Sequence, residues 1–88
     1  MIKVTYAVSI LFCKKEKWEF TRAGEIPFVP QMGQLISIED EDFTVHSTLW
    51  NDRNKTLYVD LYDWDTDDEK YLSDLLKDFQ LQGWQSAV

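Results

Sequence analysis

Three short apolar-patterned runs follow one another in the middle of the chain and predict the centre of the fold. They span residues 35–38, 43–50 and 56–62. Each run is rich in β-branched and aromatic residues and is bounded by polar turn residues, which is the pattern of β-strands. We therefore predict an antiparallel three-stranded meander over residues 33–62.

Side chains alternate between the two faces of a strand, so the apolar pattern also suggests a register for this meander. Ile38 facing Phe43 leaves a four-residue turn, Glu39, Asp40, Glu41 and Asp42. Leu49 facing Leu57 makes residues 51–55 the second connection. We take this register as the first prediction; its inward-facing residues are Ile36, Ile38, Phe43, Val45, Ser47, Leu49, Leu57, Val59 and Leu61.

The outer face of the meander carries the only histidine of the chain. The predicted register places His46 opposite Asp60, and Thr48 opposite Tyr58. A second connection shorter by two residues keeps the same faces but places His46 opposite Tyr58. Both registers remain open at the level of the sequence.

A hairpin is predicted before the meander. Residues 2–12 alternate strictly and give one fully apolar face, residues 13–17 form the turn, and a second strand ends near Arg22. Phe12 opposite Trp18 would form an aromatic cross-strand pair. Residues 2–12 are also a candidate edge strand for pairing with a second copy.

The segment that joins the hairpin to the meander is unusually apolar. Ala23-Gly24 ends the predicted hairpin, and Pro27 and Pro30 favour extended backbone outside a central strand. Gly33 supplies a turn before the meander. We expect a crossover that closes one end of the core, and the alternative is an exposed apolar patch that binds a partner or small ligand. The apolar side chains concerned are Ile26, Phe28, Val29 and Met32.

A helix follows the meander. Thr66 as N-cap and Glu69 three residues later fit a capping box. An apolar stripe at helical spacing follows, formed by Tyr71, Leu72, Leu75, Leu76 and Phe79. Gly83 fits the left-handed residue that ends a helix, and Trp84 would then pack back on Phe79 as in a Schellman motif.

These elements predict an α+β fold that is mainly antiparallel β: a hairpin, a three-stranded meander and one C-terminal helix packed on the sheet. Its 88 residues form a single domain, residues 1–88. The five strands either curl into a small SH3-like barrel or lie as an open sheet. We favour a sheet packed on both sides, with the helix on the outer face at Tyr58, Tyr62 and Trp64.

Charge is distributed unevenly along the chain. The net charge is −7; residues 1–38 hold five basic and three acidic residues, whereas residues 39–88 hold four basic and 13 acidic ones. Such a field disfavours direct binding to nucleic acid and favours a basic partner. No apolar run approaches the roughly 20 residues that span a bilayer, and the first residues lack a signal-peptide pattern, so we expect a cytoplasmic protein.

Residues that carry chemistry are few. Cys13, the single cysteine, forms neither an internal disulfide nor a cysteine-based zinc site, and we expect an ordinary thiol beside a turn. His46 lacks a second histidine for a transition metal, and we expect a structural cross-strand contact. Asp63-x-Asp65-x-Asp67 resembles the opening of a calcium loop, but Asp68 replaces the required glycine. We expect no enzyme, no metal and no cofactor.

The most distinctive feature is a mixture of acidic and aromatic residues at the start of the helix. We predict a small acidic, non-enzymatic protein whose acidic face binds a basic partner surface. In a sharper form it inhibits a nucleic-acid-binding protein by imitating phosphates, as phage-encoded anti-defence or toxin-immunity proteins do. Predicted partner-binding residues are Tyr58, Asp60, Tyr62, Asp63, Trp64, Asp65, Asp67, Asp68 and Glu69, with Glu39, Asp40, Glu41 and Asp42 as a secondary acidic turn. The alternative is a small-ligand-binding or accessory subunit domain that uses residues 26–32.

Overall fold

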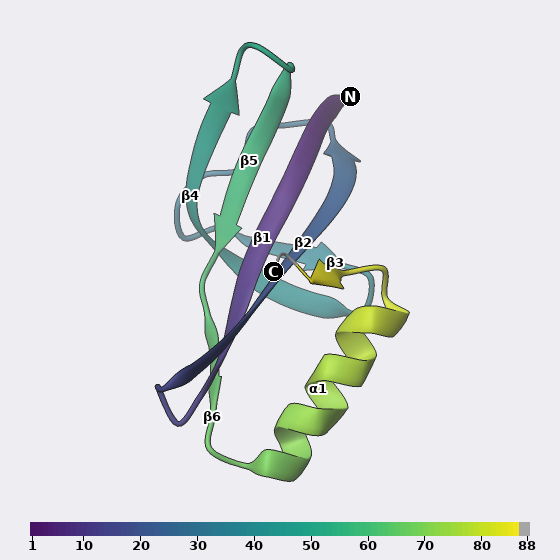
Figure 1. Cartoon of the computed structure of the whole chain (residues 1–88). Coiled ribbons are helices and arrows are strands. Elements are labelled where there is room, and N and C mark those ends of the chain that lie inside the picture. Colours follow the sequence, from purple (N-terminus) through teal and green to yellow (C-terminus); the bar gives the residue numbers. More distant parts are fainter. Residues whose placement is uncertain (87–88) are drawn as a thin grey trace.

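The computed structural model describes residues 1–86, which form a bent β-sheet with one helix beside it (Figure 1). In chain order the elements are β1 (Ile2–Phe12), β2 (Glu16–Ile26), β3 (Leu35–Ile38), β4 (Glu41–Asn51), β5 (Thr56–Leu61), β6 (Trp64–Thr66), α1 (Glu69–Leu81) and β7 (Gln85–Ser86). The predicted α+β architecture is confirmed: a mostly antiparallel sheet carries one C-terminal helix. The sheet is not closed into a barrel. A helix long and apolar enough to cross a membrane is not found in residues 1–86.

The first strand lies at the centre of the sheet. The strand order is β3-β4-β5-β1-β2-β7, and β6 also pairs with β1. β1 is antiparallel to β2 but parallel to β5 and β6. The prediction that residues 2–12 form an edge strand was therefore wrong, because β5 and β6 occupy the side of β1 that a second copy would need.

The hairpin of β1 and β2 is tighter and longer than predicted. Ile10, not Phe12, faces Trp18. The turn is shorter because Cys13 and Lys14 both take positive φ, 53° and 56°, and the Lys15 N–H donates to the Phe12 carbonyl at 3.0 Å. β2 then continues past Arg22 to Ile26.

Gly24 lies inside β2 and does not end the hairpin as predicted. A Cβ atom at this position would come within 3.2 Å of Cε2 of Tyr6. The glycine therefore lets the Tyr6 ring lie against the backbone of β2, and the strand passes through it without interruption.

The first meander turn is also shorter than predicted. Ile36 faces Phe43 and Ile38 faces Glu41, so the turn contains Glu39 and Asp40 alone. Glu39 takes a φ of 55°, which makes the tight reversal possible. The shift is by two residues, which leaves the inward faces unchanged, and Ile38 and Phe43 are buried as predicted.

A β-bulge at His46 changes the second half of the meander. The pairing of β4 with β5 shifts between Val45 and Ser47, and His46 has no opposite residue. Ser47 faces Asp60, and Leu49 faces Tyr58. Both predicted positions of His46, opposite Asp60 and opposite Tyr58, were therefore wrong, as was the predicted Leu49–Leu57 pair.

The same shift changes the neighbour predicted for Thr48. This residue faces Val59 and not Tyr58. One extra residue in β4 has moved every later side chain of the strand to the opposite face.

The core lies on one face of the sheet, under the helix. Alternate residues of β1 from Val4 to Ile10 are buried, whereas Thr5, Ala7 and Ser9 on the other face are only partly covered. The Phe79 ring of α1 lies within 5.2–6.2 Å, centroid to centroid, of four aromatic rings: Phe20, Phe43, Trp64 and Trp84. The expectation of a sheet packed on both sides, with the helix on the outer face at Tyr58 and Tyr62, was wrong, because the helix packs on the face that carries Val4 and Ile10. The predicted contact with Trp64 is made, with its ring centroid 5.4 Å from that of Phe79.

Both ends of α1 have well-formed caps. Asp68, not Thr66, is the N-cap: its Oδ1 accepts hydrogen bonds from the N–H groups of Lys70 and Tyr71 at 3.0 and 3.3 Å. At the other end the prediction is confirmed. Gly83 has a φ of +90°, and the Trp84 N–H donates to the Phe79 carbonyl at 3.0 Å, which is the Schellman pattern.

The crossover between β2 and β3 closes one end of the core, as expected. Ile26 and Pro30 are buried. Gly33, with a φ of +85°, donates its N–H to the Val45 carbonyl at 2.7 Å and so ties the crossover to β4. Phe28, Val29 and Met32 remain exposed.

Candidate functional site

The predicted acidic residues line the path from β5 to the helix. Asp60 lies in β5, Asp63 follows it, Asp65 lies in β6, Asp67 and Asp68 precede α1, and Glu69 is the first helical residue; all six are exposed. We call these six carboxylates the acidic rim.

Three members of the acidic rim form a row. β6 pairs with β1 in an extended conformation, with Ile10 beside Trp64. Alternation turns Trp64 inward and leaves Asp63, Asp65 and Asp67 exposed. Asp65 lies in β6 and Asp63 and Asp67 flank this short strand, so three exposed carboxylates follow one another at alternate residues along the chain.

Two carboxylates of the acidic rim have structural partners. Asp68 caps the helix, and Asp60 accepts a hydrogen bond from the Ser47 hydroxyl at 3.4 Å. Within residues 1–86, no hydrogen bond or ion pair involves the side chains of the other four, Asp63, Asp65, Asp67 and Glu69. These four charges are therefore available to a partner without breaking an existing contact.

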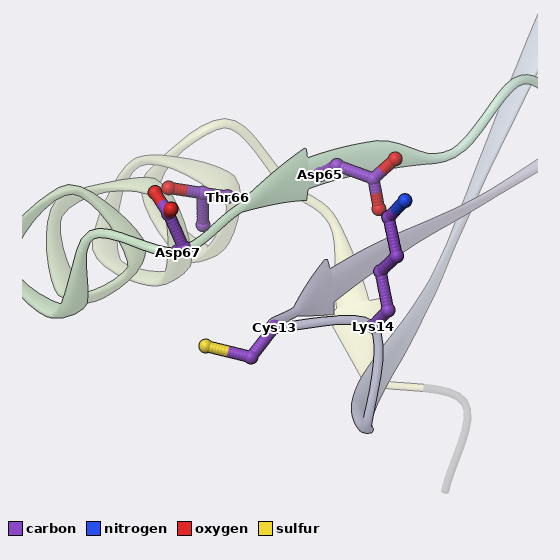
Figure 2. A pocket seen from close by; sticks show the side chains of 5 residues that line it. All are labelled: Cys13, Lys14, Asp65, Thr66 and Asp67. Carbon is purple, nitrogen blue, oxygen red and sulfur yellow. The ribbon is translucent and has the colours of Figure 1, made fainter.

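A basic residue lies beside the row, which the sequence did not predict. The β1–β2 turn meets β6 in a shallow pocket of about 410 Å³ lined by Cys13, Lys14, Asp65, Thr66 and Asp67 (Figure 2). The Cys13 N–H donates to the Thr66 carbonyl at 3.0 Å and fixes the turn there. Lys14 extends toward β6 in Figure 2 without forming an ion pair within residues 1–86, so it moderates the negative field near Asp65. Only the parallel pairing of β1 with β6 brings these residues together.

The three predicted aromatic residues differ in their surroundings. Trp64 is stacked on Phe43 with its ring centroid at 5.3 Å, so it belongs to the core edge. Tyr58 is half-buried, and its hydroxyl accepts a hydrogen bond from the Asn54 amide at 3.2 Å. Tyr62 is 47% exposed, and of the three rings it is the most accessible to a partner.

His46, Ser47 and Asp60 meet on the outer face beside Tyr62. His46 Nδ1 lies 3.4 Å from the Ser47 hydroxyl oxygen, and that hydroxyl donates to Asp60 at 3.4 Å. The carboxylate contacts the hydroxyl and not the imidazole, so this is not the base and orienting acid of a catalytic triad. A pocket of about 310 Å³ lies here, lined by His46, Asp60, Leu61, Tyr62 and Asp63.

The calcium-like spacing does not gather its carboxylates around one point. Within residues 1–86 no group of three or more His, Cys, Asp or Glu residues is placed to hold a metal ion. The physical reason is the short strand β6 in the middle of this segment, which holds the backbone around Asp65 extended, whereas a calcium loop curls its ligands around the ion.

The secondary acidic turn is a separate surface. Glu39 pairs with Arg22, and Asp42 accepts a hydrogen bond from Ser37. Arg22 also packs beside Gly83 at the C-terminal end of α1, because a Cβ atom on Gly83 would lie 3.4 Å from its Nε. The acidic rim lies at the other end of α1, whose 13 residues span about 20 Å.

The crossover carries the alternative site. A cavity of about 380 Å³ is lined by Tyr6, Glu25, Ile26, Pro27, Phe28, Leu35, Ile36 and Ser37. Ile26 belongs to the core, so the exposed part of the predicted patch is Phe28, Val29 and Met32, to which the structure adds Leu35. Sequence analysis missed Leu35 because the strand pattern placed it within the meander.

No family model, no curated protein and no solved structure matches this chain.

Proposed function

We propose that the chain is a small, non-enzymatic protein that binds a basic surface of another protein through the acidic rim. The observation that supports this function is the set of four exposed carboxylates without a partner in residues 1–86: Asp63, Asp65, Asp67 and Glu69. Lysine or arginine side chains of a partner neutralise such charges without displacing any internal contact.

The charge distribution supports the same function at long range. Residues 39–88 carry 13 of the 16 acidic residues, and this excess steers a basic partner toward that part of the molecule. Tyr62 adds an exposed ring beside Asp63, where an arginine gains a cation–π contact as well as an ion pair.

In the sharper form of the proposal, the basic partner surface is a nucleic-acid-binding groove and the protein acts as its inhibitor in the cytoplasm. The row of Asp63, Asp65 and Asp67 supports this form because successive negative charges along the chain resemble those of a phosphate backbone. The comparison with phage anti-defence and toxin-immunity proteins is an analogy of charge and size.

The test compares binding by three immobilised proteins in lysate of the source cells. The first is wild type, the second carries Asp63→Asn, Asp65→Asn and Asp67→Asn, and the third carries Glu25→Gln, Asp74→Asn and Asp78→Asn. The third removes the same net charge from exposed acidic residues outside the rim. Asp68 is left unchanged because it caps the helix.

We expect wild type and the third protein to capture the same basic partner, which elutes in high salt, and the second protein to lose it. Quantitative mass spectrometry measures the loss. Displacement of the partner by competing DNA or RNA supports the sharper form. Equal capture by all three proteins would rule out the acidic rim as the binding surface.

The second candidate function is a small-ligand-binding or accessory subunit domain. It is favoured by the cavity of about 380 Å³ beside the exposed Phe28 side chain. Replacing Phe28 and Met32 by serine removes binding under this function but leaves binding through the acidic rim intact. Thermal unfolding of the variant checks that the fold has survived.

A further inference from the structure

We propose that the free edge of β4 pairs with the same edge of a second copy, so that two chains form one continuous sheet. β4 pairs with β3 only over Glu41–Thr44, and with β5 from Val45 to Asn51. The Gly33–Gln34 backbone covers the outer side of Val45. Within residues 1–86, residues 47–51 have no strand on that side (Figure 1).

This edge lacks the features that normally prevent strand pairing. Natural edge strands are protected by charged residues, by proline, by bulges or by a covering segment. Residues 47–51 are Ser, Thr, Leu, Trp and Asn, and the bulge at His46 lies before them. Leu49 is 68% exposed and Trp50 is 49% exposed, on opposite faces of the strand.

A second copy is the occupant that fits this edge, because the edge is complementary to itself. In an antiparallel pair with a two-fold axis at Leu49, Leu49 faces Leu49, and Thr48 faces Trp50 of the second copy. Ser47 faces Asn51. Each apolar side chain thus gains a neighbour, and two chains of net charge −7 approach each other along a segment without charged residues.

Five residues of strand, about 17 Å, form a small interface, so the dimer is in rapid exchange with the monomer and depends on concentration. Sedimentation equilibrium over a range of concentrations measures it. We expect the wild-type mass to rise from 10.5 kDa toward twice that value. Leu49→Lys places two like charges at the axis, and we expect it to weaken the dimer at least about tenfold, which corresponds to about 1.4 kcal/mol.

The matched control is Leu81→Lys, which makes the same change at a leucine that is 85% exposed at the end of α1. We expect this variant to associate like wild type. A wild-type protein that stays monomeric up to about 1 mM, or equal association of the two lysine variants, would overturn the proposal. Thermal unfolding of both variants checks that each is folded.

A disulfide test examines the register itself. At a two-fold axis only Leu49 faces its own copy, with Cα atoms about 4.5–5.5 Å apart, which is within the range of a disulfide. Chains that carry Cys13→Ser together with Leu49→Cys should cross-link under mild oxidation at least about tenfold faster than chains that carry Cys13→Ser with Thr48→Cys. Equal rates, or no cross-link in either chain, would contradict pairing about Leu49. The rate of cross-linking does not depend on Asp65 or Asp67, so the proposed dimer can be disproved while the proposed function holds.

Discussion

His46 decides which side chains of β4 face the core. Before this residue, Phe43 and Val45 are buried by regular alternation. The bulge inserts one unpaired residue, so Trp50 lies on the core side, opposite Leu57, and Leu49 turns outward. The most exposed apolar side chain of the meander is thus a direct consequence of one extra residue in one strand.

Asp68 is the residue on which the start of α1 depends. Its Oδ1 accepts hydrogen bonds from two backbone N–H groups, whereas the Thr66 hydroxyl accepts only the N–H of Asp68 itself. Asp68→Ala should lower the free energy of unfolding by about 1 kcal/mol, and Asp68→Asn should lower it by much less because asparagine also caps well. Urea denaturation measures both, and Thr66→Ala is the comparison. A larger loss with Thr66→Ala would identify Thr66 as the functional cap.

Tyr6 gives the fold a specific sensitivity to alkaline pH. Burial raises the pKa of Tyr6 above its ordinary value of 10.0, and the nearby Arg22 guanidinium lowers it to a smaller extent. Above about pH 10 the unfolded chain loses the phenolic proton while the folded chain still holds it, so unfolding becomes more favourable as pH rises. Below that pH both states hold the proton and the effect vanishes.

Tyr6→Phe removes this proton and leaves the other titrating groups in place. The stability difference between wild type and Tyr6→Phe, from urea denaturation, should be constant up to about pH 9 and should fall above about pH 10. A difference that stays constant across the whole range would show that the phenol titrates alike in the folded and unfolded chains.

At the scale of elements, three buried side chains of α1, Leu72, Leu75 and Phe79, pack into the core, and Phe79 makes the aromatic contacts. Phe79 is 1% exposed and contacts the rings of Phe43, Trp64 and Trp84 as well as that of Phe20. The Schellman motif places Trp84 against Phe79, with their centroids 5.4 Å apart, so the end of the helix and its packing depend on each other.

Phe79→Ala should therefore lower the free energy of unfolding by about 3–5 kcal/mol, because it leaves a cavity between four aromatic residues. Phe79→Leu keeps much of the volume and should cost roughly 1–2 kcal/mol, which remains measurable if the alanine variant fails to fold. Phe28→Ala, at an exposed ring, is the control and should change stability little. Chemical denaturation compares all three, and a loss at Phe28 as large as that at Phe79 would contradict this account of the core.

Helices and strands with a local sequence pattern could be predicted, but the lengths of the turns between the strands could not. The apolar stripe of α1, followed by Gly83, is a pattern of neighbours in the chain. It was predicted correctly for Leu72, Leu75 and Phe79, which are buried, but Tyr71 is 47% exposed and lies outside the stripe. The tight turns at Cys13 and Glu39 use positive φ at residues that usually avoid it, so nothing in the sequence distinguishes them from longer turns. Both registers were consequently displaced by two residues.

At the scale of the molecule, the parallel pairing of strands could not be predicted from local sequence patterns. β1 pairs with β5 and β6 across more than 50 residues of chain, and this pairing makes β1 central and directs the helix to the face of Val4 and Ile10. For the candidate site, the alternation of Asp63, Asp65 and Asp67 around Trp64 was visible in the sequence. The position of Lys14 near Asp65 could not be predicted from the sequence, because it depends on the pairing of β6 with β1.

The row of carboxylates should itself cost stability, and this cost can be measured without a partner. Asp63 and Asp65 are exposed neighbours two residues apart in the chain and form no ion pair within residues 1–86. The screening length is about 30 Å at 0.01 M salt and about 3 Å at 1 M, so their repulsion acts fully in the first condition and hardly in the second. Asp63→Asn with Asp65→Asn should stabilise the fold by up to about 1 kcal/mol at low salt, and the gain should vanish at high salt.

Glu25→Gln with Asp74→Asn removes the same net charge from two separated positions, and we expect a smaller gain from it. Thermal unfolding at both salt concentrations compares the pairs. An equal gain in stability for both double variants would mean that the gain comes from the change in net charge alone. A gain specific to the row, together with loss of the captured partner, would mean that these carboxylates oppose folding and favour binding, which is the trade-off expected of a functional surface.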